Sequence, residues 1–232
     1  LQKVSVFPKN TSVVLNQYVL YIALPAMALH YLPKIKLSWD LLLPVSVAWI
    51  AFLFAFLFFN ILGKIFNWSR KLIGCLILTA GLGNTSFVGI PVIKALYGDA
   101  GINTLIIVDL PGTFVVLSTL GILVATLYSS QKKEKTSFLK KLVTFPPLIA
   151  FLIGLTFAIT KIDFPLALSE TFNQLAATIS PIALISVGFQ LKFKTYSKHF
   201  KFLFLGLFFQ LIMVPAIIFG IFYGLLNQTD LV

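Results

Sequence analysis

Seven long apolar runs dominate this sequence, and each is about as long as a helix that crosses a lipid bilayer. A membrane-spanning helix needs about 20 mostly apolar residues, because its backbone must pair its own polar groups inside the hydrocarbon. Hydrophobic residues make up 59% of the 232 positions and charged residues only 11%, too few to coat a water-soluble domain. The sequence therefore predicts an all-α, polytopic transmembrane bundle with spans at 13–32, 41–62, 72–97, 102–127, 142–160, 171–189 and 202–226.

Basic residues are divided unevenly between the two sides of these spans. Fourteen of the 18 Lys and Arg residues flank one side and three flank the other, while Lys94 lies inside a span. Cytoplasmic loops of membrane proteins carry the excess of positive charge, which places the richer side in the cytoplasm. We therefore expect a multi-pass protein of the cell membrane, with residue 1 cytoplasmic and residue 232 outside. The net charge of +11 orients the chain in the bilayer, and no nucleic-acid partner is expected.

The first and sixth spans share a short pattern. Each opens with an Asn-Gln pair, at Asn16 and Asn173, and a proline follows nine and eight positions later, at Pro25 and Pro181. The charge distribution makes these two spans run in opposite directions, which is typical of inverted-repeat transporters. Coincidence is the alternative, because an Asn-Gln pair and a proline within a span are undemanding matches.

An inverted repeat divides the chain into two halves. The first repeat covers 1–128, a cytoplasmic basic loop covers 129–141, and the second repeat covers 142–232. Four spans precede the loop and three follow it. One further span before residue 1 and two after residue 232 would complete five plus five, so we expect the chain to be truncated at both ends.

The third span is predicted to be interrupted near its middle. Residues 71–82 and 87–98 are apolar segments of about 18 Å each at ~1.5 Å per residue, so each crosses half of a ~30 Å hydrocarbon core. Between and beside them lie residues that disfavour a continuous helix or suit a new helix start: Gly83, Asn84, Thr85, Ser86, Gly89 and Pro91. We predict a helix break formed by Gly83, Gly89 and Pro91, in which the glycines permit non-helical backbone angles and Pro91 suits the first turn of the new helix. A glycine-kinked but continuous helix is the alternative.

Two half-helices that meet inside a membrane present opposite partial charges to the space between them. The outer half-helix points its N-terminus, capped by Asn84, Thr85 and Ser86, at the membrane centre and favours an anion. The inner half-helix presents free carbonyl groups, which suit a cation. The predicted substrate-binding residues are Asn84, Thr85, Ser86, Gly89 and Pro91, together with Asn173 and Ser180 from the sixth span.

Asp109 is the only acidic residue well inside a predicted span. Carboxylates within a membrane are costly and usually functional, so Asp109 is a candidate site for a coupling proton or sodium ion. A structural hydrogen bond to a neighbouring helix is the alternative. No other cofactor and no metal site are expected. Gln210 is expected to serve helix packing.

The nine residues 83–91, GNTSFVGIP, resemble the signature of the auxin efflux carrier family, within the bile acid/sodium symporter superfamily. Residues 15–29 (LNQYVLYIALPAMAL) and 181–191 (PIALISVGFQL) resemble that family's second and seventh helices. The resemblance implies ten spans in two inverted repeats, with helices four and nine broken and crossing. The present chain would supply helices two to eight, seven of the ten, and would lack the second broken helix.

These observations together predict a secondary transporter of small organic anions such as carboxylates, working by alternating access at a broken-helix crossover. Its partners are the anion and the lipid bilayer, and the sequence leaves a homodimer open. A sodium-coupled, bile-acid-type organic anion symporter is the alternative, and a seven-helix sensor or receptor is a remote one. An enzyme is not expected, because Asp109 has no second carboxylate at its depth for acid–base chemistry.

Overall fold

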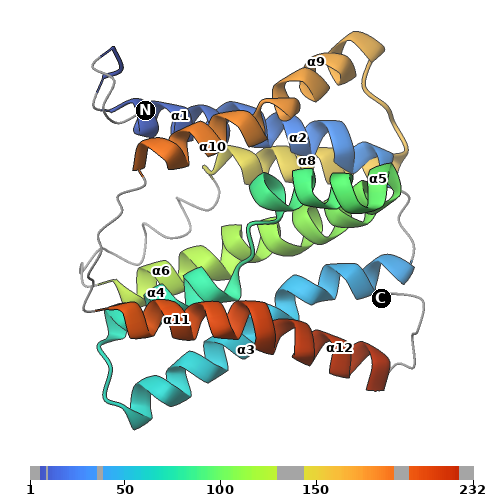
Figure 1. The fold of residues 1–232 in the computed structure, drawn as a ribbon. Helices are drawn as coiled ribbons and strands as arrows, with labels where there is room; N and C mark the ends of the chain where they lie inside the picture. The colour runs from blue at the N-terminus through green and yellow to red at the C-terminus, as the bar shows by residue number, and fades with distance from the viewer. Residues whose placement is uncertain (1–5, 9, 36–38, 130–143, 191–198, 225–232) are drawn as a thin grey trace.

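Helices make up the part of the chain that the structure, a computed structural model, describes: residues 6–8, 10–35, 39–129, 144–190 and 199–224 (Figure 1). No strand is present among these residues, which confirms the all-α prediction. Residues 1 and 232 and all but the first residue of the basic loop 129–141 lie outside them. Five of the described helices are long and apolar enough to cross a membrane: Thr11–Lys34, Leu42–Ile65, Ala100–Tyr128, Leu166–Gln190 and Phe200–Gly224.

The elements follow the predicted spans in order. The first span contains α1 (Thr11–Tyr18), η1 (Val19–Ala23), α2 (Leu24–Tyr31) and η2 (Leu32–Lys34). The second contains η3 (Trp39–Leu41) and α3 (Leu42–Ile65). The third and fourth contain α4 (Arg70–Gly81), η4 (Thr85–Gly89), α5 (Ile90–Ile107), η5 (Val108–Phe114), η6 (Leu117–Gly121) and α6 (Ile122–Tyr128). The last three contain α8 (Pro146–Thr160), α9 (Leu166–Ala177) with α10 (Ile179–Gln190), and α11 (Phe200–Phe208) with η7 (Phe209–Met213) and α12 (Val214–Gly224).

Two helices of the second half begin several residues from the predicted position, and one of them is α9, which begins at Leu166 rather than at residue 171. Helix α8 begins at Pro146 rather than at residue 142, because proline lacks the N–H that a helix interior needs and suits the first helical turn. The boundary between the third and fourth spans, by contrast, lies within the predicted interval 98–101, as a sharp turn in α5 at Gly98, where φ is 65°. Glycine adopts this left-handed conformation without the steric cost that a Cβ brings.

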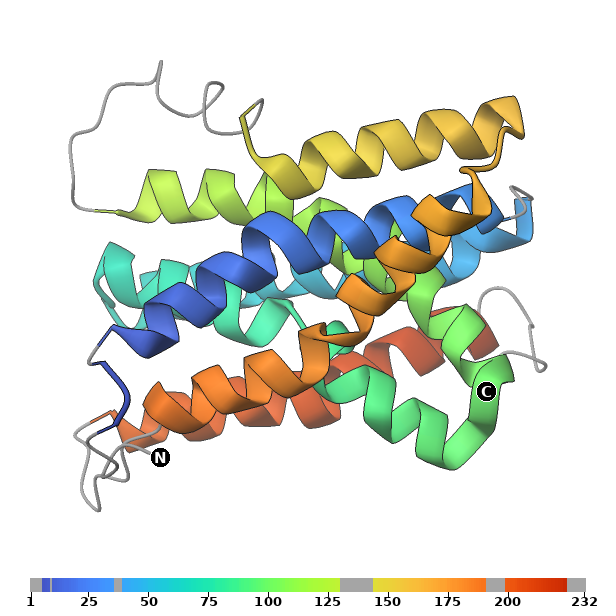
Figure 2. The ribbon, with the colours of Figure 1, turned by 90° about the horizontal axis from the view of Figure 1, so that it is seen from above.

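The helices form two bundles that lie side by side (Figures 1 and 2). The first bundle contains α1, α2, α8, α9 and α10, in which α2 packs against both α8 and α9, and α1 packs against α10. The second bundle contains α3, α4, α6, α11 and α12, in which α4 packs against α3, α6 and α11. The span Ala100–Tyr128, which ends in α6, connects the bundles, because its residues belong to the hydrophobic cores of both.

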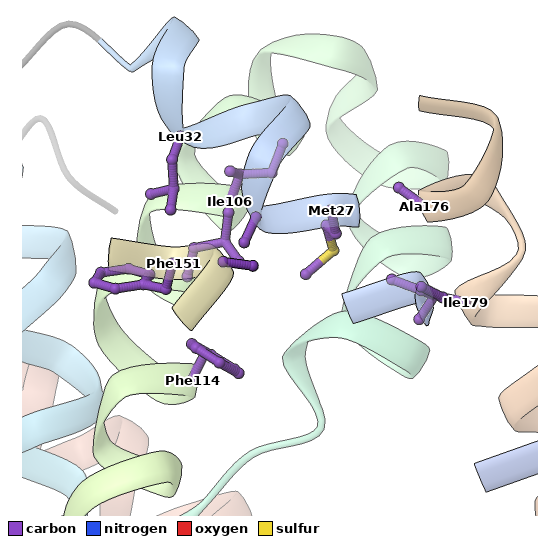
Figure 3. Close-up of a cluster of buried hydrophobic side chains, with 11 residues drawn as sticks. Met27, Leu32, Ile106, Phe114, Phe151, Ala176 and Ile179 are labelled. Carbon is purple, nitrogen blue, oxygen red and sulfur yellow. The ribbon is translucent and has the colours of Figure 1, made fainter. Parts of the chain in front are cut away.

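Each bundle has its own hydrophobic core. The core of the first bundle is shown in Figure 3 and includes Met27, Phe151 and Ile179, with Ile106 and Phe114 contributed by the connecting span. The core of the second bundle includes Phe52, Phe59, Ile77 and Phe209, with Val116 and Val124 from the same connecting span. The connecting span is therefore buried on both sides, in contrast to Phe200–Gly224, of which only 6% is buried.

Polar side chains join α1 to α10 inside the first bundle. Ser186 is fully buried, and its hydroxyl contacts Asn16 Oδ1 at 2.6 Å and the Ser12 carbonyl at 3.1 Å. The Gln190 amide donates to Ser186 Oγ at 3.2 Å. The Asn16 side chain, which the repeat pattern singled out, therefore joins the two spans that carry that pattern.

Candidate functional site

The third span is interrupted at residues 82–84, close to the middle of the bundle. Helix α4 is started by Ser69, whose hydroxyl accepts from the Leu72 N–H at 3.4 Å, and it ends at Gly81. Leu82 is extended, with φ −121° and ψ 117°, and regular structure resumes at Thr85 in the π-helical turn η4. The Gly89 N–H donates to the Asn84 carbonyl at 3.1 Å, which closes the first turn after the gap.

Close packing places the end of α4 against α3. A Cβ built on Gly81 would lie 2.7 Å from Ala55 Cβ, so only glycine allows α4 and α3 to approach this closely. Gly83 has room around it, since its Cβ would meet nothing nearer than 3.8 Å. The two glycines therefore act differently: Gly81 fixes the position of the helix end, and Gly83 lies in the gap itself.

The gap itself is short, from residue 82 to residue 84. Gly89 has helical backbone angles, φ −61° and ψ −49°, and precedes α5, in which Pro91 is the second residue. Neither residue lies in the gap itself: Pro91 lies in the first turn of the new helix, and Gly89 directly precedes that helix. The physical reason is that Pro91 costs no hydrogen bond at a helix start, and glycine remains helical where the surrounding helices hold it.

Asp109 lies against the first turn after the gap. It belongs to η5 and is buried, with 5% of its surface exposed. The Thr85 hydroxyl donates to Asp109 Oδ1, and the Ser86 hydroxyl donates to Oδ2 at 2.6 Å. The fold thus brings three of the predicted residues together, from two successive spans. Among the described residues no basic side chain pairs with this carboxylate, so the two hydroxyls are the groups that stabilise it.

The local sequence of η5 explains how Asp109 comes this close. Pro111 lies inside η5 and lacks a backbone N–H, which favours the wider π-helical turn. Gly112 faces α3, and a Cβ there would lie 3.2 Å from the Val45 carbonyl oxygen. The small residue lets the connecting span approach α3, and this approach places Asp109 beside η4.

A cavity of about 290 Å³ opens next to the gap, and we call it the break cavity. Its lining comes from α3, from the end of α4 and the gap, from η5, and from the α11–α12 span: Val47, Ala48, Ala51, Ala80, Gly81, Leu82, Gly83, Thr85, Val108, Thr113, Gln210, Leu211 and Val214. Thr85 belongs to this lining and also donates to Asp109. The buried carboxylate is therefore one side chain away from the cavity.

Gln210 is a residue of this site that sequence reasoning assigned to helix packing alone. Its Nε2 donates to the Leu82 carbonyl at 3.3 Å, so an amide from η7 satisfies a carbonyl at the end of the inner half-helix. An amide in an otherwise apolar span is a signal that the sequence does contain. Its partner, 128 positions earlier, could not be predicted from that signal.

The remaining predicted site residues are less central. Asn84 is an exposed residue of the gap, and it has an interaction partner in the structure. Asn173 lies in α9 and donates to Glu170 of the same helix at 3.5 Å. Ser180 lies near the start of α10, which packs against η4. The first bundle therefore reaches the break through α10, and Asn173 is engaged locally. Among the described residues no group of three or more metal-ligating side chains occurs.

Comparison with known proteins places the chain in a family. Residues 1–230 match the family described as membrane transport protein. An uncharacterized transporter of Methanocaldococcus jannaschii is 33% identical over 186 residues, which cover 77% of this chain and 59% of that protein. An uncharacterized transporter of Methanothermobacter thermautotrophicus is 30% identical over 119 residues, 51% of this chain and 38% of that protein.

The chain spans at most about three fifths of the length of these relatives, and no solved structure matches it. The names of the family and of both relatives point to transport rather than to catalysis. The several membrane-length helices agree with them. The resemblance to the auxin efflux carriers, first indicated by residues 83–91, is confirmed, and the chain belongs to this family of multi-pass membrane transport proteins.

Proposed function

We propose that the protein is a secondary transporter of small organic anions, carboxylates in particular, in the cell membrane. The observation that carries this proposal is the contact between the helix break and Asp109 beside the break cavity. The cavity is bordered by the start of the outer half-helix, whose free N–H groups favour a negative charge. A volume of about 290 Å³ is at the lower end of small-molecule sites, which suits a small anion.

Asp109 links the anion to a coupling ion. An ionised carboxylate one side chain from the cavity opposes the binding of an anion, because like charges at short range repel. A proton on Asp109 removes that repulsion. Proton binding and anion binding then favour each other, and this reciprocity is the thermodynamic requirement for coupled transport.

Sodium coupling is a second candidate that one observation favours. Oxygen atoms of the Thr85 and Ser86 hydroxyls and the Asp109 carboxylate lie together beside the break, and Leu82 lines the same cavity as Thr85. Hard cations prefer oxygen ligands, and a sodium ion would neutralise Asp109 as a proton does. The runner-up is therefore a sodium-coupled organic anion symporter that uses the same residues.

In this proposal, the two bundles are the parts that move to expose the site to one side of the membrane and then to the other. The gap, the break cavity and Gln210 all belong to the second bundle or to the connecting span, while α10 covers η4 from the first bundle. Movement of the second bundle against the first, by an elevator-like or a rocking displacement, would carry the site from one side of the membrane to the other.

Thermal unfolding of the full-length protein tests the proposal. The protein would be screened against mono- and dicarboxylates at several pH values, with and without sodium, and against the uncharged amides of the same acids. We expect stabilisation by at least one carboxylate and none by its amide. A stronger effect at lower pH supports proton coupling, and a sodium-dependent effect supports the runner-up. Equal stabilisation by acids and amides, or by neither, would rule out an anion site at the break.

A further inference from the structure

Two cavities of the second bundle meet at Gln210. One is the break cavity. The other has a volume of about 560 Å³ and lies between α4 and α11, and we call it the α4–α11 groove. Gln210 lines both of them. The groove is bordered by Thr79 near this junction and by Lys71 and His199 at the ends where α4 and α11 begin.

The two cavities follow one another along the same pair of helices. On the α4 side, the groove is lined by residues between 69 and 79 and the break cavity by residues 80–83. On the α11 side, the groove is lined by residues between 199 and 210, and the break cavity by residues between 210 and 214. From Lys71 to Leu82 the chain rises by ~17 Å of helix, about half of the hydrocarbon thickness. Groove and cavity together therefore extend from one end of the bundle to its middle.

The hydrogen bond from Gln210 to Leu82 crosses the junction. The Leu82 carbonyl is at the end of α4, where no helical N–H follows to bond it, so a side chain takes that place. At 3.3 Å the contact is at the long end for an N–H···O bond. Gln210 is half-buried and reaches Leu82 through a flexible side chain, so this bond can open without movement of either helix.

We propose that Gln210 is a gate between the break cavity and the α4–α11 groove. Bonded to Leu82, its side chain closes the junction; released, it opens a passage from the break to the end of the bundle where Lys71 lies. The cation at that mouth attracts the negatively charged solutes that the proposed function assigns to the break. The inference rests on that function for its substrate, but the passage itself can be tested without any substrate.

Thiol modification measures access through the junction. In full-length protein carrying Cys75→Ser, a single cysteine is placed beyond the gate by Thr113→Cys or before it by Thr79→Cys. Thr113 lines the break cavity and is 8% exposed, so it is reached slowly, whereas Thr79 is exposed in the groove. The probe is a small, membrane-impermeant methanethiosulfonate with a sulfonate group, added to the side where α4 begins. Gln210→Met keeps the length of the side chain and removes its donor.

Gln210→Met should raise the modification rate of Thr113→Cys at least fivefold and leave that of Thr79→Cys within twofold. Gln190→Met is the matched control, because Gln190 also donates to a carbonyl, that of Ser186, but in the first bundle. The control should change neither rate. An unchanged rate at Thr113→Cys, or an equal rise at both cysteines or in the control, would overturn the gate. A protein that binds no carboxylate would still give the expected rates, so failure of the proposed substrate is distinguishable from failure of the gate.

Discussion

Asp109 holds both carboxylate oxygens against hydroxyl groups, and this arrangement determines what a substitution there should do. Asp109→Asn keeps the size of the side chain and one oxygen acceptor while it removes the charge. We expect the variant to fold, with a loss of at most ~1–3 kcal/mol for a donor left unpaired. Substrate accumulation driven by an ion gradient should fall at least tenfold, because the proposed function assigns the coupling ion to the Asp109 carboxylate. Substrate uptake into proteoliposomes with an imposed ion gradient measures this accumulation.

Asp163→Asn is the control for this change, since Asp163 is exposed between α8 and α9. It should leave accumulation unchanged. Undiminished accumulation in Asp109→Asn as well would restrict Asp109 to a structural role, as an acceptor that holds η4 against η5.

The sequence singled out three residues that the structure brings together, but it did not indicate how they pair. A polar triplet and a lone acid inside apolar runs cost too much to be incidental, so Thr85, Ser86 and Asp109 could be picked out directly. Their pairing depends on the close approach of Gly112 to α3, which is a property of tertiary packing. The hydrogen bond from Gln210 to Leu82 could not be predicted for the same reason. A single amide in a sequence does not indicate which carbonyl it bonds in the folded chain.

The helix break depends on two glycines that should respond differently to alanine. Gly81→Ala places a methyl group 2.7 Å from Ala55 Cβ, which cannot move without its backbone, so we expect a loss of ~1–3 kcal/mol in stability. Gly83→Ala meets nothing nearer than 3.8 Å and gains ~1 kcal/mol of helix propensity. It should leave stability unchanged or raised, and weaken substrate binding about fivefold by favouring closure of the gap.

Thermal unfolding and calorimetry on the purified full-length variants give the two readouts. Gly220→Ala is a suitable control, since a Cβ added at this position of α12 would meet nothing within 4 Å. Wild-type affinity in a well-folded Gly83→Ala protein would place the substrate site away from the gap.

The contact between α1 and α10 supports a prediction about the first bundle. Ser186 is fully buried and donates to Asn16 at 2.6 Å, so the two side chains should be energetically coupled. Hydrogen bonds between membrane helices contribute ~0.6 kcal/mol on average and up to ~1.7. A double-mutant cycle with Asn16→Ala and Ser186→Ala, followed by unfolding in mixed micelles, should give a coupling energy in this range. Strict additivity of the two single changes would mean that the bond contributes nothing to the packing of α1 on α10.

The boundaries of the helices are less predictable from the sequence than the order of the spans. Apolar length located the spans well, because it reflects the thickness of the bilayer. Apolar length does not locate the ends of the gap: Gly83 lies in the gap, while Gly89 and Pro91 lie at the start of the next helix, the position that suits a proline. The propensities of glycine and proline are weak guides inside a bundle, where neighbouring helices decide the backbone conformation.

The orientation of the whole molecule in the membrane is a prediction from charge that labelling in intact cells can check. Cys75 is exposed and is first replaced by serine. Lys64→Cys lies in the last turn of α3, on the lysine-rich side, and should be protected from an impermeant maleimide. Asp163→Cys should react, because it lies on the opposite side. The reverse pattern would invert the topology, and permeabilised cells, in which both cysteines react, serve as the control.

The interleaving of the two bundles along the chain has a consequence for biosynthesis. Met27 and Leu32 are synthesised about a hundred residues or more before Phe151 and Ile179, which share their hydrophobic core. In the meantime α3, α4 and α6 are synthesised, and they belong to the other bundle. The first span therefore lacks the part of its packing that α8 and α9 provide until these later helices are made. Substitutions that delay these late helices would leave an unassembled early span exposed to membrane quality-control proteases, even where the mature protein would tolerate them.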